Sequence, residues 1–372
     1  MSTAKQNGRF FCSIVFLNIC AATASISSPS DGWAAEPKAR GVNVNELRPI
    51  ENPRPLLADC PEFIEPIRET ARFEAPPLVA EKDADLAVRA WRFFYNARGI
   101  IEMPNRLRAD RTAVIVVHPW GIDDGQGWKS PQSAGVAFFC TPEKNRIYHR
   151  HVRQVVNPFL KSMRGNVALI MNSLPGGEDP IRRKLYRSFR QKTTAQARRK
   201  GQVELEQKLK SFSYRGQPVI QKIPLSAEQP VGDYFRQFPG LDAGANFNNA
   251  GFWDLLNPVV RDIQVGLNDV VIYDLEGYDA LKTFLQKQGI RHVLLAGYAT
   301  DMCVCSTTAG YENLRKDFNV FLVGVATLAT FPAMSTPKSA TTASIAKASF
   351  QLPITQVSWV RPLKAKEVAG AE

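Results

Sequence analysis

The chain has 372 residues, of which 44% are hydrophobic and 22% are charged, and its formal net charge is +12. This balance is typical of a globular protein with one large domain or two ordinary ones. Its six cysteines are too few and too scattered for a disulfide-stapled mini-domain, and no segment beyond the N-terminus approaches the ~20 apolar residues of a membrane span.

The N-terminus has the layout of a targeting segment. Lys5 and Arg9 precede an apolar run from Phe10 to Ala22, and Ala22-Thr23-Ala24 is a small-x-small cleavage site. This pattern predicts a secretory signal peptide over residues 1–24 and therefore export to the periplasm or the cell exterior. The alternative is a disordered or fused N-terminus. Export would place Cys60 and Cys140 in an oxidising compartment, where they could pair.

Residues 25–110 form the second predicted region, an N-terminal arm that ends in a hairpin. The first part of it is rich in proline and polar residues, which predicts an extended arm lying over the domain. The aromatic run Arg89–Tyr95 has the alternating pattern of a strand, and Asn96–Gly99 is typical of a turn. Ile100–Met103 would then be the returning strand, so the pattern predicts a hairpin.

A different rhythm begins near residue 111, where short apolar runs alternate with helical spacing. A run of this kind without polar interruption indicates a strand buried on both faces. Such strands are predicted at 113–117, 167–171, 270–273, 293–296, 320–323 and 354–359, and helices at 151–163, 280–288, 303–315 and 339–350. The alternation predicts an α/β domain over 111–372. We expect a three-layer sandwich around a mostly parallel sheet of about six strands.

An insertion over 175–260 interrupts this rhythm, and its first part is strongly basic. Residues 182–222 hold 13 Lys or Arg residues against Glu204 and Glu206, and a helix is predicted from Arg187 to Lys210. We expect the insertion to stand over the carboxyl edge of the sheet as a cap. Its charge suits a solvated face, or an anionic polymer or surface as a partner. No nucleic-acid partner is expected, because the segment has no recognisable nucleic-acid-binding motif.

Cys303 is the strongest candidate for a chemical group. The fourth predicted strand leads into Gly297-Tyr-Ala-Thr-Asp-Met-Cys303, and Thr300 or Asp301 is suited to cap the helix that should follow. In the first turn of that helix, the free N–H groups would favour a thiolate and could hold an oxyanion. The alternative is a small cysteine packed against the sheet.

The segment from Gly297 to Val304, followed by Thr307-Thr-Ala309 and by Val320–Val325, resembles the nucleophile segment of the isochorismatase-like cysteine hydrolases. The resemblance covers about 113–175 and 262–360. It implies hydrolysis of C–N bonds in small amides, with a small-molecule substrate and usually a homo-oligomer. It also implies Cys303 as nucleophile, a cis peptide before Ala299, and the backbone N–H groups of Ala299 and Cys303 as oxyanion donors.

The other two charged residues of that family's triad are not matched. His118 follows the first strand, where the family has an aspartate, and no lysine follows the third strand, where Asp274 lies instead. In one interpretation His118 is the base, and Asp123, Asp124 or Asp274 orients its ring. In the other, the protein is catalytically inactive and binds a small molecule or a polyanion.

Our prediction is an exported cysteine hydrolase of a small amide-like C–N bond, working through a covalent Cys303 intermediate. The catalytic candidates are Cys303, His118 and Asp124. Trp120, Tyr298 and Asp274 are the candidates for substrate binding. We predict no metal ion and no other cofactor.

Overall fold

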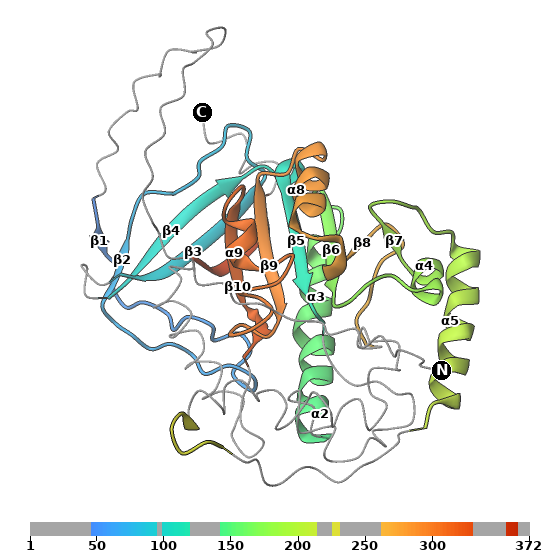
Figure 1. Cartoon of the computed structure of the whole chain (residues 1–372). Coiled ribbons are helices and arrows are strands. Elements are labelled where there is room, and N and C mark those ends of the chain that lie inside the picture. The colour runs from blue at the N-terminus through green and yellow to red at the C-terminus, as the bar shows by residue number, and fades with distance from the viewer. Residues whose placement is uncertain are drawn as a thin grey trace, which may run out of the picture. The chain divides into compact units, whose positions relative to one another are not determined.

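The described residues form one large sheet with helices on both of its faces (Figure 1). In the computed structural model, the structure describes residues 46–94, 99–119, 142–213, 225–230, 262–329 and 355–363. All of them lie in one compact unit, Asn45–Glu372. Within these ranges no helix is long and apolar enough to cross a membrane.

Eleven strands make up this sheet, in the order β1-β2-β4-β3-β11-β10-β9-β5-β6-β8-β7. Their bounds are β1 Arg48–Pro49, β2 Arg72–Glu74, β3 Leu86–Phe94, β4 Gly99–Leu107, β5 Thr112–Val117, β6 Leu169–Leu174, β7 Arg187–Ser188, β8 Val270–Tyr273, β9 His292–Tyr298, β10 Asn319–Leu328 and β11 Gln356–Pro362. The strands from β11 to β7 pair in parallel, which confirms the predicted parallel core.

Seven helical segments accompany the described strands. They are α2 Pro142–His151, the π-helix η2 Val152–Val156, α3 Asn157–Met163, α4 Pro180–Leu185, α5 Ala195–Ser211, α8 Tyr278–Lys287 and α9 Tyr311–Leu314. Two short 3-10 turns, η1 Ala109–Arg111 and η4 Asp274–Glu276, complete the described elements. The predicted helix over 339–350 lies outside the described residues.

The apolar strands are buried on both faces because successive side chains point to opposite sides of a sheet. In β5, Val114 and Val116 belong to one hydrophobic cluster, while Ile115 and Val117 belong to another. The continuous helix from α2 through η2 to α3 packs into the first cluster, and α8 packs into the second. This arrangement confirms the three-layer α/β sandwich.

The sheet is wider than the sequence indicated, because the hairpin and the arm extend it. The predicted hairpin forms as β3 and β4, and β3 pairs antiparallel with β11 at the edge of the parallel core. On the outer side, β4 pairs with β2 and β2 with β1. Part of the predicted arm, residues 48–49 and 72–74, is therefore strand within the sheet.

The insertion differs from its prediction in one respect. Helix α5 begins at Ala195, where the Thr194 hydroxyl accepts a hydrogen bond from the N–H of Ala197, and not at Arg187. Residues 187–188 instead form β7, which pairs in parallel with β8 as the last strand of the sheet. Helices α4 and α5 lie beyond that edge (Figure 1). Residues 214–224 and 231–261 are outside the described part.

Candidate active site

Three side chains meet at the carboxyl edge of the parallel strands. His118 follows β5, Asp274 follows β8, and Cys303 lies in the turn that follows β9. Strands β9 and β5 are neighbours in the sheet, and β8 is separated from β5 by β6 alone. Ligands of parallel α/β sheets bind at this edge, because the loops that leave the strands converge there.

His118 is held in place by its backbone as well as by its ring. Its φ is +39°, a region in which histidine is found more often than most residues. Its N–H donates to the carbonyl oxygen of Ser173 at the end of β6, at 2.9 Å. Its side chain is 5% exposed. The imidazole therefore has a fixed position in a nearly dry environment.

The His118 ring joins the other two side chains. Its Nε2 lies 2.9 Å from Oδ2 of Asp274, and the ring also interacts with the side chain of Cys303. Burial lowers the pKa of His118, but the hydrogen bonds and charges of Asp274 and Cys303 outweigh burial and raise it to about 9. At neutral pH the ring is therefore an imidazolium between a carboxylate and the sulfur.

The turn that carries Cys303 begins with a close backbone contact. Gly297 has a φ of +110°, and a Cβ at this position would lie 2.0 Å from the carbonyl oxygen of Val117. The next residues are joined by a cis peptide bond, Tyr298–Ala299, as the resemblance implied. Only glycine permits β9 to approach β5 so closely just before the turn.

Cys303 does not lie in the first turn of a helix, which corrects our expectation of a helix over 303–315. The segment from Thr300 to Gly310 is a series of turns, and α9 covers Tyr311–Leu314 alone. The reason is local hydrogen bonding: the N–H of Val304 returns to the carbonyl oxygen of Ala299, and that of Tyr311 to Val304. Within the described part of the chain, the backbone N–H groups of Ala299 and Cys303 donate no hydrogen bond.

Two threonines tie this turn to the rest of the site, and sequence reasoning did not single them out for this role. The Thr308 hydroxyl donates to the carbonyl oxygen of Asp274 at 2.9 Å, and the Thr307 hydroxyl donates to that of Cys303 at 2.8 Å. Thr308 therefore connects the segment after β8 with the segment after β9. The signal in the sequence for these hydrogen bonds is the Thr307-Thr308 pair shortly after Cys303, because threonine hydroxyls often bond to nearby backbone groups.

Polar atoms without partners gather at the same edge. Among the described residues, the buried atoms without a hydrogen-bond partner include Ser173 Oγ, Thr300 Oγ1 and Asp274 Oδ1. Their residues follow or end strands β6, β9 and β8. Buried polar groups are normally paired, so these atoms are suited to bind the polar groups of a substrate.

The remaining predicted site residues are distributed as follows. Tyr298 is buried in the core, with its hydroxyl 2.6 Å from Nδ1 of His151, so packing accounts for this ring. Asp274, predicted to contact substrate, meets His118 through Oδ2 and leaves Oδ1 without a partner. Trp120 and Asp124 lie outside the described residues. No group of three or more His, Cys, Asp or Glu side chains suited to a metal ion occurs within the described ranges.

The other described cysteines differ from Cys303 in their surroundings. Cys60, Cys303 and Cys305 are free and half-buried, while Cys140 lies outside the described residues. Burial and neighbouring carboxylates raise the pKa of Cys60 to about 11. Burial also raises that of Cys305 to about 11, and its thiol bonds to the carbonyl oxygen of Thr300. Of the three, Cys303 alone has an imidazolium beside its sulfur.

Comparison with known proteins supports the resemblance stated from the sequence. The model of the isochorismatase domain matches residues 257–349, which include Asp274 and Cys303. No curated protein sequence matches the chain significantly.

Several solved structures are similar to the chain. A cysteine hydrolase from Pseudomonas syringae pv. phaseolicola 1448A is 13% identical, with coverage of 71% of this chain and 93% of that one and a TM-score of 0.32. A pyrazinamidase/nicotinamidase from Streptococcus mutans UA159 is also 13% identical, with 66% and 99% covered and a TM-score of 0.32. A nicotinamidase from Bacillus subtilis is 11% identical, with 66% and 98% covered and a TM-score of 0.28. Similarity this low says nothing about activity. Residues 257–349 match the isochorismatase domain, and the resemblance of this chain to the isochorismatase-like cysteine hydrolases is confirmed.

Proposed function

We propose that the protein is a cysteine hydrolase that cleaves a small amide-like C–N bond. The observation that carries this proposal is the contact of His118 with both Asp274 and Cys303 at the carboxyl edge of the sheet. A cysteine, a histidine and an orienting carboxylate in this order form a nucleophile with its own acid–base group. The residues that follow Asp274 and precede Cys303 in the sequence, Leu275 and Met302, have exposed apolar side chains.

The first half of the reaction forms a thioester. The His118 imidazolium stabilises the Cys303 sulfur as a thiolate, and the thiolate attacks the carbonyl carbon of the substrate. The backbone N–H groups of Ala299 and Cys303 have no other acceptor among the described residues, so they are free to bind the oxyanion. His118 then donates its proton to the leaving nitrogen, the C–N bond breaks, and the amine departs.

The second half of the reaction regenerates the enzyme. The neutral His118 accepts a proton from water, and the resulting hydroxide attacks the thioester carbon. The C–S bond breaks, the acid product leaves, and the sulfur returns to its pairing with the imidazolium. Asp274 holds the ring in one orientation through both halves, so it acts as a positioning residue.

Alkylation by iodoacetamide tests this proposal. At pH 7.5 we expect Cys303 to react before Cys60 and Cys305. The pKa of each of those two thiols is about 11, so very little of either is thiolate at this pH. In His118→Asn the rate at Cys303 should fall by at least about tenfold, since the imidazolium is lost. Asparagine is chosen because it tolerates the positive φ of this position. Peptide mass spectrometry assigns each modified cysteine.

The outcome decides between the two interpretations of the site. A Cys303 thiol that reacts no faster than Cys60 and Cys305, at the same rate with and without His118, would contradict the hydrolase. A binding protein on the same fold would then remain. Cys303→Ala is the control that removes the fast phase without changing the other thiols.

Export and further partners remain proposals. Cleavage after Ala24 is the basis for export, and N-terminal sequencing of the protein from its native cell fraction tests it.

Five cations between residues 192 and 210 are exposed and suit an anionic polymer or surface: Lys192, Arg199, Lys200, Lys208 and Lys210. Salt-dependent retention on an anionic matrix, unchanged by Cys303→Ala, would support this partner, and retention lost with Cys303 would oppose it. A homo-oligomer also stays a proposal.

A further inference from the structure

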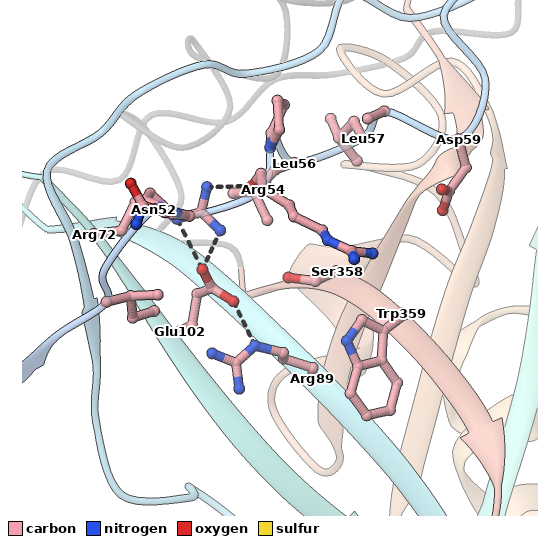
Figure 2. Close-up of a pocket in the computed structure, with 14 residues that line it drawn as sticks. Asn52, Arg54, Leu56, Leu57, Asp59, Arg72, Arg89, Glu102, Ser358 and Trp359 are labelled. Carbon is pink, nitrogen blue, oxygen red and sulfur yellow. Dashed lines mark hydrogen bonds and ion pairs between the residues drawn. The ribbon is translucent and has the colours of Figure 1, made fainter.

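A second cavity lies on the other half of the sheet, between the arm and strands β2, β3, β4 and β11 (Figure 2). Its volume is about 420 Å³, within the range of small-molecule sites. The arm segment 50–59 forms one wall, and side chains from the four strands form the other. None of its lining residues belongs to the site around Cys303.

The floor of this cavity is a buried charge cluster. Glu102 on β4 is 5% exposed, and it accepts hydrogen bonds from the guanidinium groups of Arg72 and Arg89. Arg89 also donates to Glu74 at 2.7 Å, at the rim. Because each charge of the cluster has partners of opposite sign, the floor is neutralised and rigid.

The same cluster fixes the arm over the sheet. The third bond of Arg72 runs from its NH1 group to the backbone carbonyl oxygen of Arg54, at 3.0 Å (Figure 2). This bond leaves the Arg54 side chain free to extend over the cavity. Figure 2 shows it reaching past Ser358 toward Trp359. The arm is therefore a preformed wall that presents a cation.

Three lining groups have unused binding capacity. The Arg54 side chain is exposed and has no partner among the described residues, and Ser358 Oγ is buried without one. The indole of Trp359 is 43% exposed, although large aromatic side chains are usually better buried. The guanidinium of Arg361 lies over the Trp359 ring, 5.5 Å from its centroid, and the rest of the exposed indole is available for contact. A cation, a hydroxyl donor and a partly exposed aromatic ring thus surround one space.

We propose that this cavity binds a small aromatic monocarboxylate. The guanidinium of Arg54 and the hydroxyl of Ser358 would take the carboxylate, since a planar guanidinium matches its two oxygens. The ring would pack against Trp359. Arg72 and Arg89 are neutralised by Glu102 and Glu74, so Arg54 is the lining cation left for a ligand. Asp59 also lines the cavity and repels further negative charge, which favours a monoanion over a dianion such as phosphate.

Titration with benzoate, followed by ligand-observed NMR on the full chain, tests the proposal. We expect saturable binding with a Kd on the order of 1 mM, as for a ligand of this size. Arg54→Gln should weaken binding about tenfold, because a charge-assisted hydrogen bond is lost. Benzamide, the neutral counterpart, should bind about tenfold more weakly than benzoate for the same reason.

Two controls make the result decisive. Arg48→Gln removes a similarly exposed arginine that does not line the cavity, and benzoate should bind it as it binds the unchanged chain. Cys303→Ala should also bind benzoate unchanged, which separates this cavity from the site of the proposed hydrolase. Thermal unfolding of Arg54→Gln should match that of the unchanged chain, because the side chain has no partner to lose.

Three results would overturn the proposal. These are benzoate binding that does not saturate, benzoate binding to Arg54→Gln as tight as to the unchanged chain, and loss of benzoate binding in Cys303→Ala. The last result would assign benzoate to the Cys303 site, and it would leave the proposed hydrolase standing.

Discussion

At the scale of single residues, His118 decides the chemistry of the site. The resemblance implied an aspartate after the first parallel strand, where this chain has a histidine, and Asp274, which follows β8, lies 2.9 Å from the ring. The positions of His118 and Asp274 therefore differ from what the resemblance implied, while Cys303 lies where that resemblance implied a nucleophile. The imidazole replaces a fixed anion with a group that both donates and accepts a proton.

Asp274→Asn tests the role of this carboxylate. We expect the pKa of His118, about 9 in the unchanged chain, to fall, because the amide neither carries the negative charge nor accepts the proton as strongly. NMR titration of the imidazole signals measures it, and the chain has four histidines, so His118→Asn assigns the signal.

Asp279→Asn, an exposed aspartate on α8, should leave the His118 titration unchanged. An equal shift in both variants would mean that long-range charge, and not the contact with Asp274, sets the pKa.

At the scale of elements, the turn after β9 brings the site together. Strand β9 approaches β5 at Gly297, the chain turns through the cis peptide, and Thr308 bonds to the segment after β8. The approach at Gly297 and the bond of Thr308 each join segments that are distant in the sequence. The turn is held by backbone contacts and by two threonine hydroxyls, so its geometry depends on residues other than His118, Asp274 and Cys303.

Gly297→Ala should show how close this contact is. The new Cβ would lie 2.0 Å from the carbonyl oxygen of Val117 at a φ of +110°, so we expect a loss of at least about 3 kcal/mol in the free energy of unfolding. Denaturant unfolding measures it.

Gly289→Ala is the matched control, because Gly289 also has a positive φ, of +74°, but no atom lies within 4 Å of its added Cβ. Its cost should be about 1 kcal/mol, from the backbone conformation alone. Equal losses in the two variants would contradict a steric role for Gly297.

At the scale of the whole molecule, two hydrophobic clusters on opposite faces of the sheet hold the fold together. The strands of the arm and hairpin widen the sheet beyond its parallel core, and β2, β3 and β4 contribute to one wall of the second cavity. One sheet therefore carries both proposed sites, with the Cys303 site on its parallel part.

Global stability should depend on pH through His118. Its pKa is raised from 6.5 to about 9 on folding, so its stabilisation is complete below about pH 6.5 and is lost as the pH rises through about 9. Between pH 6 and pH 9 we expect the free energy of unfolding to fall by about 3 kcal/mol relative to His118→Asn.

Denaturant unfolding of both proteins across this range gives the difference. Parallel curves for the two proteins would show that His118 has the same pKa in the folded and unfolded chains.

How much the sequence predicted depends on the range of the interactions involved. The parallel strands β5, β6, β8, β9, β10 and β11 were all expected, because their apolar runs are local signals of burial on both faces. The short strands β1, β2 and β7 were not, since two or three residues carry no period and form only by pairing with a neighbour.

The sequence by itself determined the fold class, the place of Cys303 after a buried strand, and His118 as its candidate partner. The tertiary structure alone decided that Asp274 is the partner of His118, that Cys303 lies in a turn and not in a helix, and that Arg72 holds the arm over a second cavity. Periodicity and spacing report local conformation and burial. The pairing of side chains from different strands depends on how the sheet brings their ends together, which no local pattern encodes.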